Sequence, residues 1–253
     1  MYKWKFGPFL CVFTVSIFLF LNLPAGAQTY KVEAVNNGGT ITGTVMLEGA
    51  PPKPRVMTVT KDKDVAKDET REVDVVKVRE GKVAEAVVYL EKVKAGRDWP
   101  ELAEGGTVDQ KDARFLTASR VIHKGMKVPV KNSDPVMHNI HAYELIGRGR
   151  RTLFNKGQPK GFSFNLAFDT KRTPYVKLEC DAHNYMHEYL FVADNPYYSV
   201  TGEDGTFRIT GIPAGTYNLA VWHPNLGTEK AQVTVAAGQT LTHEFTFKSK
   251  GGK

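Results

Sequence analysis

Apolar residues alternate with polar ones along most of the chain, and turn-forming residues interrupt the pattern every few positions. Side chains on a β-strand point alternately to its two faces, so an apolar period of two predicts strands with one buried face. The nearest candidate for a long helix, around residues 93–102, is interrupted by Gly96 and Pro100. The pattern therefore predicts an all-β protein. The clearest expected strands are residues 40–47, 86–90, 127–131, 175–180, 189–193, 206–209, 217–222, 232–235 and 240–247.

The N-terminus has the pattern of a secretory signal peptide. Lys3 and Lys5 precede an apolar run over residues 9–23, which ends at the small residues 25–27. Because this run is short for a membrane span, we expect cleavage after Ala27 and export to the periplasm, with no membrane span afterwards. An anchor that stays uncleaved is the alternative.

Charge does not point to nucleic acid. Removing Lys3 and Lys5 with the signal segment lowers the net charge from +7 to +5. The basic residues are scattered among acidic ones instead of forming an aromatic-interleaved stripe, so a nucleic-acid partner is not expected.

Of the two cysteines, only Cys180 remains after that cleavage. A single cysteine in an oxidising compartment cannot form an intramolecular disulfide, so it is either a buried thiol or a metal thiolate. Val176, Leu178 and Cys180 share one face of their expected strand, which directs the thiol into the core. Its neighbours then decide between the two alternatives.

A thiolate, an imidazole and a thioether follow one another at Cys180, His183 and Met186. Soft sulfur ligands with imidazole select copper, and two His, one Cys and a weak axial Met make up a type 1 copper site. Zinc is disfavoured because it tolerates a thioether poorly. His138 and His141 compete as the second imidazole. They point to opposite faces of an extended segment, and His138 shares its face with apolar neighbours.

These residues resemble the cupredoxin family. The order Asn132, Asp134, His138-Asn139, then a strand and Cys180-x2-His183-x2-Met186, is similar to that family, with the loop spacing of amicyanin. The chain is also similar to exported bacterial proteins of the plastocyanin-like or methylamine-utilisation type. The resemblance implies a cupredoxin Greek-key β-sandwich holding one type 1 copper ion, with His138, Cys180 and His183 in the copper plane and Met186 axial.

The same resemblance implies roles for the neighbours of the ligands. Asn139 is expected to form a hydrogen bond near the cysteine sulfur and to tune the site. Electrons are expected to leave through an exposed edge of His183, with Asn184 and Tyr185 forming the partner docking surface. Related chains carry cysteines near the positions of Ala66 and Ala113, where this chain has alanines, so a disulfide tether to the copper domain is not expected here.

A second module surrounds this region. Residues 202–217 alternate turn chemistry with apolar residues and resemble the carboxypeptidase regulatory-like, or transthyretin-like, β-sandwich, whose opening is matched by residues 41–45. We expect residues 28–98 and 194–253 to form this sandwich, with residues 99–193 inserted as the copper domain. Three consecutive small units are the alternative. The charged stretch 61–72 is predicted to be a solvated surface loop, not a binding site, and no function is assigned to it.

The sequence thus favours a single-electron carrier whose partners are redox proteins such as a cytochrome c or a dehydrogenase. No catalytic motif is found, so enzyme activity is not expected. A copper protein for storage, delivery or sensing, and a metal-free structural or adhesion sandwich, remain as alternatives.

Overall fold

The computed structural model describes Met1 and residues 30–102 and 106–249. The predicted signal peptide therefore lies outside the described residues. Within them, one short helix, α1 (Lys63–Ala66), accompanies a long series of strands, which confirms the all-β prediction. No helix among the described residues is long and apolar enough to span a membrane.

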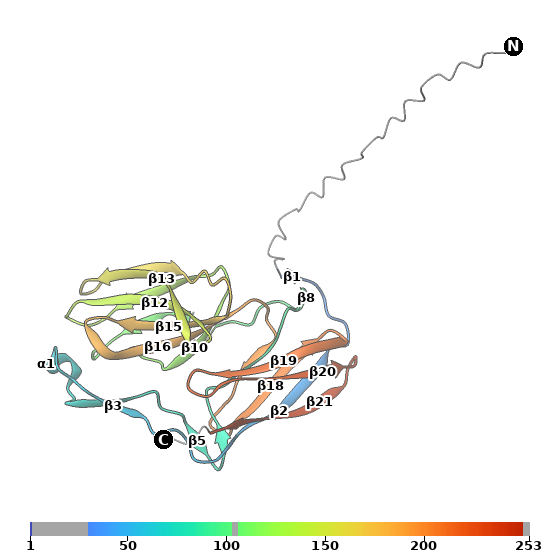
Figure 1. Ribbon diagram of the computed structural model, residues 1–253, viewed down its shortest axis with the longest axis horizontal. Helices are drawn as coiled ribbons and strands as arrows, with labels where there is room; N and C mark the ends of the chain where they lie inside the picture. The colour runs from blue at the N-terminus through green and yellow to red at the C-terminus, as the bar shows by residue number, and fades with distance from the viewer. Residues whose placement is uncertain (2–29, 103–105, 250–253) are drawn as a thin grey trace.

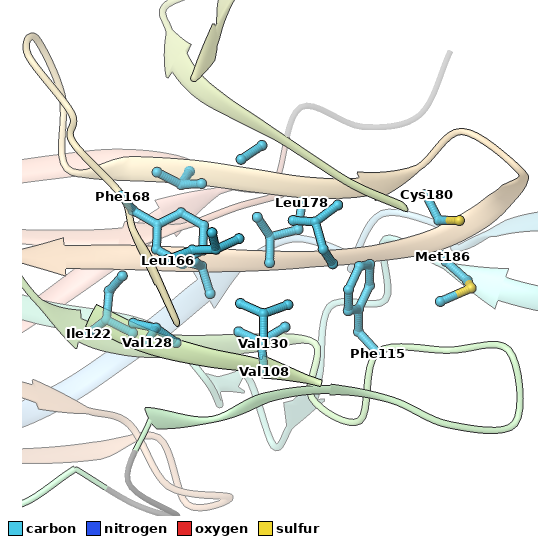
Figure 2. Packing of buried hydrophobic residues seen from close by; sticks show 14 of the residues in the cluster. Val108, Phe115, Ile122, Val128, Val130, Leu166, Phe168, Leu178, Cys180 and Met186 are labelled. Carbon is cyan, nitrogen blue, oxygen red and sulfur yellow. The ribbon is translucent and has the colours of Figure 1, made fainter. Parts of the chain in front are cut away.

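The middle of the chain forms one sandwich, called the central sandwich below. A five-stranded sheet in the order β10-β16-β15-β12-β13 packs on a three-stranded sheet in the order β14-β11-β9, and side chains from both sheets fill one apolar cluster (Figure 2). Alternate residues of β15 are buried, so Cys180 points into the cluster, as its strand parity predicts. The strands are β9 (Val108–Gln110), β10 (Ser119–His123), β11 (Lys127–Asn132), β12 (His138–Ile146), β13 (Gly149–Gln158), β14 (Ser163–Ala167), β15 (Tyr175–Cys180) and β16 (His183–Ala193).

The two ends of the chain form the second, or terminal, sandwich. One sheet has the order β17-β7-β19-β20, and the other has the order β18-β2-β6-β5 with β21 also paired to β2. Strands that precede the central sandwich thus pair with strands that follow it, so the central sandwich interrupts the terminal one. The strands are β2 (Gly39–Glu48), β5 (Val78–Arg79), β6 (Lys82–Val83), β7 (Val87–Leu90), β17 (Tyr198–Val200), β18 (Thr206–Ile212), β19 (Gly215–His223), β20 (Gly227–Val235) and β21 (Thr240–Lys248). A small pair, β1 (Lys31–Val32) with β8 (Ala95–Gly96), lies near the start of the described chain.

An aromatic cluster joins the two sandwiches. Phe191 of the central sandwich packs with Tyr89 and Trp222 of the terminal one. Tyr175 stacks on Trp222 with ring centroids 4.7 Å apart, and its hydroxyl lies 2.8 Å from that of Tyr89. The sandwiches therefore share a buried contact in addition to their two chain connections.

Residues 55–74 leave the terminal sandwich after β2 and lie against the central one (Figure 1). This segment, called the cap below, consists of β3 (Arg55–Thr58) paired with β4 (Thr70–Val73) and of helix α1 between them. Val59, Ala66 and Val73 are 0–7% exposed and belong to the apolar cluster of the central sandwich. The prediction of a solvated loop at 61–72 is therefore wrong in part: most of its charged side chains are exposed, but Ala66 and Arg71 are buried.

Candidate metal centre

A tight connection between two strands brings Cys180 and His183 together. Cys180 is the last residue of β15 and His183 the first of β16, and the two residues pair directly across the ladder. Both are 1% exposed. The pairing resumes at His187 opposite Glu179, so residues 184–186 have no partner on β15 and bulge from the ladder.

The side chains of the three residues in the bulge point in different directions. Met186 is 1% exposed and lies with Cys180 at the same end of the apolar cluster (Figure 2). Asn184 is exposed, whereas Tyr185 is 4% exposed and packs under the cap. Tyr185 therefore does not contribute to a docking surface, which corrects the sequence prediction for this residue.

His138 enters the site from the start of β12. The turn before it is held by Asn132, whose side-chain amide donates to the Val136 carbonyl at 2.9 Å and accepts from the Asp134 N–H at 2.9 Å. His138 is 0% exposed. His141, three residues later, lies on the other face of β12, where its ring stacks on Tyr143 and its Nδ1 lies 3.0 Å from an oxygen of Asp181. The structure thus brings His138, and not His141, to Cys180.

Three donor atoms converge in this buried space. Nδ1 of His138 lies 3.1 Å from Nδ1 of His183, and the Cys180 Sγ lies 3.8 Å and 3.5 Å from these two nitrogens. Bonds of about 2.0 Å to nitrogen and about 2.3 Å to sulfur, at angles near tetrahedral or trigonal, place donors roughly 3.3–3.8 Å apart. Both sulfur–nitrogen distances fall in this range and the nitrogen–nitrogen distance of 3.1 Å lies just below it, so a small widening between the two rings would fit a single metal ion between the three atoms.

A carboxylate fixes the outer nitrogen of each imidazole. Asp134 Oδ2 lies 2.8 Å from Nε2 of His138, and Asp62 Oδ2 lies 2.8 Å from Nε2 of His183. An ionised carboxylate only accepts hydrogen bonds, so each Nε2 carries the proton and each Nδ1 turns a lone pair toward the other ring and the sulfur. Burial lowers the pKa of His138, against the opposing effect of Asp134. A neutral imidazole with its lone pair directed inward is the state that binds a metal.

The sulfur has polar neighbours of its own. Burial raises the pKa of the Cys180 thiol, while backbone N–H groups of Asn139, Ala182 and His183 act in the opposite direction. The Asn139 side-chain oxygen lies 3.4 Å from Sγ and accepts from the Asp181 N–H at 2.7 Å. Asn139 thus lies beside the sulfur, and its side chain joins the start of β12 to the turn after β15. A bound cation would supply the charge that a buried thiolate otherwise lacks.

Two carboxylates of this site were not singled out from the sequence. Asp134 belongs to the sequence motif, but the motif alone assigns it no role; a polar residue four positions before an inward His is a weak signal of such a contact. Asp62 lies 121 residues before His183 in a charged stretch that gave no local signal. Only the path of the cap over the central sandwich brings it to the site.

Comparisons with known proteins locate the terminal sandwich. Residues 192–248 match the carboxypeptidase regulatory-like domain. The matched stretch contains β17 to β21, and the remaining strands of the terminal sandwich come from the N-terminal side of the chain. No curated protein matches the chain.

Two solved structures are similar to parts of this chain. A novel purple cupredoxin from Nitrosopumilus maritimus aligns with 34% of this chain and 96% of its own, at 20% identity and a TM-score of 0.29. A copper-containing nitrite reductase from Thermus scotoductus SA-01 aligns with 59% of this chain and 28% of its own, at 14% identity and a TM-score of 0.29. The function of the site therefore rests on its own side chains.

Proposed function

We propose that this protein holds one copper ion through His138, Cys180, His183 and Met186 and carries single electrons between redox partners. The observation that supports this most is the convergence of two imidazole Nδ1 atoms and one thiol sulfur within 3.8 Å of each other in a fully buried space. Two His and one Cys with a weaker Met form the set that suits copper and disfavours ions preferring oxygen ligands.

The donors stand on rigid supports. His138, Cys180 and His183 lie at the ends of three neighbouring strands, β12, β15 and β16, of one sheet. Asn139 and the two carboxylates fix their side chains from behind. Copper held in this way supplies one-electron oxidation and reduction. A rigid site suits that role because the ligands need to move little between the two oxidation states.

The same burial favours a carrier over an enzyme. All four side chains are 0–1% exposed, so a substrate has no open approach to the donor atoms. The protein residues themselves supply four ligands, which leaves no position assigned to a reactant. The expected partners are other redox proteins, such as a cytochrome c or a dehydrogenase, in the periplasm.

An absorption spectrum of the protein with one equivalent of Cu(II), followed by voltammetry, tests the proposal. We expect an intense blue band from charge transfer between the cysteine sulfur and copper, and a reversible one-electron wave. Copper that passes to an acceptor or weak chelator within minutes would instead indicate delivery or storage. Protein that binds no Cu(II) would identify Cys180 as a structural thiol.

A further inference from the structure

The cap closes the side of the metal centre where His183 lies. The imidazole of His183 is 0% exposed, and the atom that covers its outer edge is Oδ2 of Asp62, 2.8 Å from Nε2. Asp62 itself is partly exposed, so it stands between His183 and solvent. The outward imidazole edge expected from the cupredoxin resemblance is therefore covered in this chain.

The backbone at Asp62 is arranged for this contact. Asp62 precedes helix α1 with φ 50° and ψ 43°, the left-handed region that Asp and Asn tolerate better than most residues. An Asp at the start of a helix ordinarily accepts from the N–H groups of the first turn, but here the side chain makes no such bond. It reaches away from the helix to His183 instead.

Further contacts hold the cap in place. The side chain of Arg71 is 8% exposed, and its guanidinium donates to the carbonyl of Ala66 within the cap at 2.7 Å and to that of Ala113 at 2.6 Å, which joins the cap to the loop after β9. It also lies over the ring of Tyr185, 5.2 Å from the centroid.

We propose that Asp62 is a positioning residue for His183 and that the cap seals the His183 edge from solvent and from a docking partner. The positioning role rests on the proposed copper function, whereas the seal is a property of the protein alone. Asp62 keeps the proton on Nε2 and directs Nδ1 inward, as Asp134 does for His138. An anionic acceptor on each imidazole makes both rings stronger donors to a cation and favours the more highly charged oxidised ion.

The seal is tested on metal-free protein by carbethoxylation with diethyl pyrocarbonate, followed residue by residue with peptide mass spectrometry. His183 should react slowly in the wild type. In Asp62→Asn and Asp62→Gly it should react faster by on the order of tenfold, because a charged hydrogen bond contributes at least that factor to local opening. Both replacements tolerate the left-handed backbone, so folding should be retained. His243, on the terminal sandwich, serves as the internal reference.

Asp64→Asn is the matched control, since it removes the same charge two residues further on, at an exposed position in the first turn of α1. Its His183 should react as in the wild type. Equal reaction rates of His183 in the wild type and both Asp62 variants would overturn the seal. Fast reaction of His183 in the wild type would overturn it as well.

The positioning role is tested by Cu(II) affinity and reduction potential. Loss of a hydrogen-bond partner behind a metal ligand ordinarily weakens metal binding by about 10- to 100-fold, and we expect Asp62→Asn to do so and to raise the potential. Asp64→Asn should change neither. An Asp62→Asn protein with wild-type affinity and potential would refute the positioning role. A wild type that binds no copper would refute the proposed function, while the carbethoxylation result would still decide the seal.

Discussion

The attachment of the cap to the central sandwich should depend mainly on Arg71. Its guanidinium donates to the buried carbonyls of Ala66 and Ala113 and to the Asp112 carbonyl at 2.7 Å. In Arg71→Met a chain of similar length fills the space but donates nothing. Each buried acceptor left without a donor costs about 1–3 kcal/mol, so two of them predict a loss of about 2–6 kcal/mol.

That loss should appear as opening of the cap, not as a general loss of stability. Native-state hydrogen exchange of the β3 and β4 amides measures the opening free energy directly. The amides of β19 and β20, in the terminal sandwich, should keep their protection.

Arg114→Met provides the control, because Arg71 and Arg114 both pair with Asp68, at 3.2 Å and 3.0 Å, but Arg114 is half exposed. An exposed ion pair contributes at most about 1 kcal/mol, so this variant should leave cap opening nearly unchanged. An Arg71→Met protein whose opening free energy changes by less than about 1 kcal/mol would contradict the anchoring role. Equal effects of the two variants would contradict it too.

Two more predictions concern the site and its support. In the proposed site Met186 is the axial ligand, which tunes the potential, so Met186→Gln should keep copper and the blue colour but lower the reduction potential; complete loss of copper would mean that the site is of another type. Burial disfavours the charge on Glu144, but backbone N–H groups of residues 171–173 and the guanidinium of Arg151 outweigh this and hold its pKa at about 2, below its ordinary 4.5. The ionised Glu144 therefore contributes about 3 kcal/mol to the free energy of unfolding, which is complete above pH 4.5 and is lost as the pH falls through 2. Glu144→Gln should flatten the dependence of stability on pH between these values. An acid titration by circular dichroism that is the same for the variant and the wild type would refute this.

The fold was predictable wherever local pattern and burial agree. The period of two placed Val176, Leu178 and Cys180 on one face of a strand, and these side chains are buried together in the structure. The strand expected at residues 127–131 is β11, one residue longer. Such agreement follows from geometry, because a strand with one buried face allows only one set of inward positions.

The cap was not predictable for the opposite reason. A run rich in Lys, Asp and Glu carries few apolar residues, and the buried ones of the cap, Val59, Ala66 and Val73, are too far apart to produce a period. The contact between Asp62 and His183 spans 121 residues and depends on a chain excursion from one sandwich to the other. The burial of Tyr185 has the same cause. The sequence around a residue does not indicate which distant segment will cover it in the fold.

The central claim is that two buried imidazoles and one thiol hold a copper ion, and it can be tested through the two histidines of β12. His138→Ala and His141→Ala would be loaded with Cu(II) beside the wild type, and the charge-transfer band and copper content of each measured. His138 contributes its Nδ1 to the centre, so its variant should lose the band, while His141, on the opposite face beside Asp181, should leave the band near normal. A colourless His141→Ala protein, or a wild type without the band, would contradict the site described above.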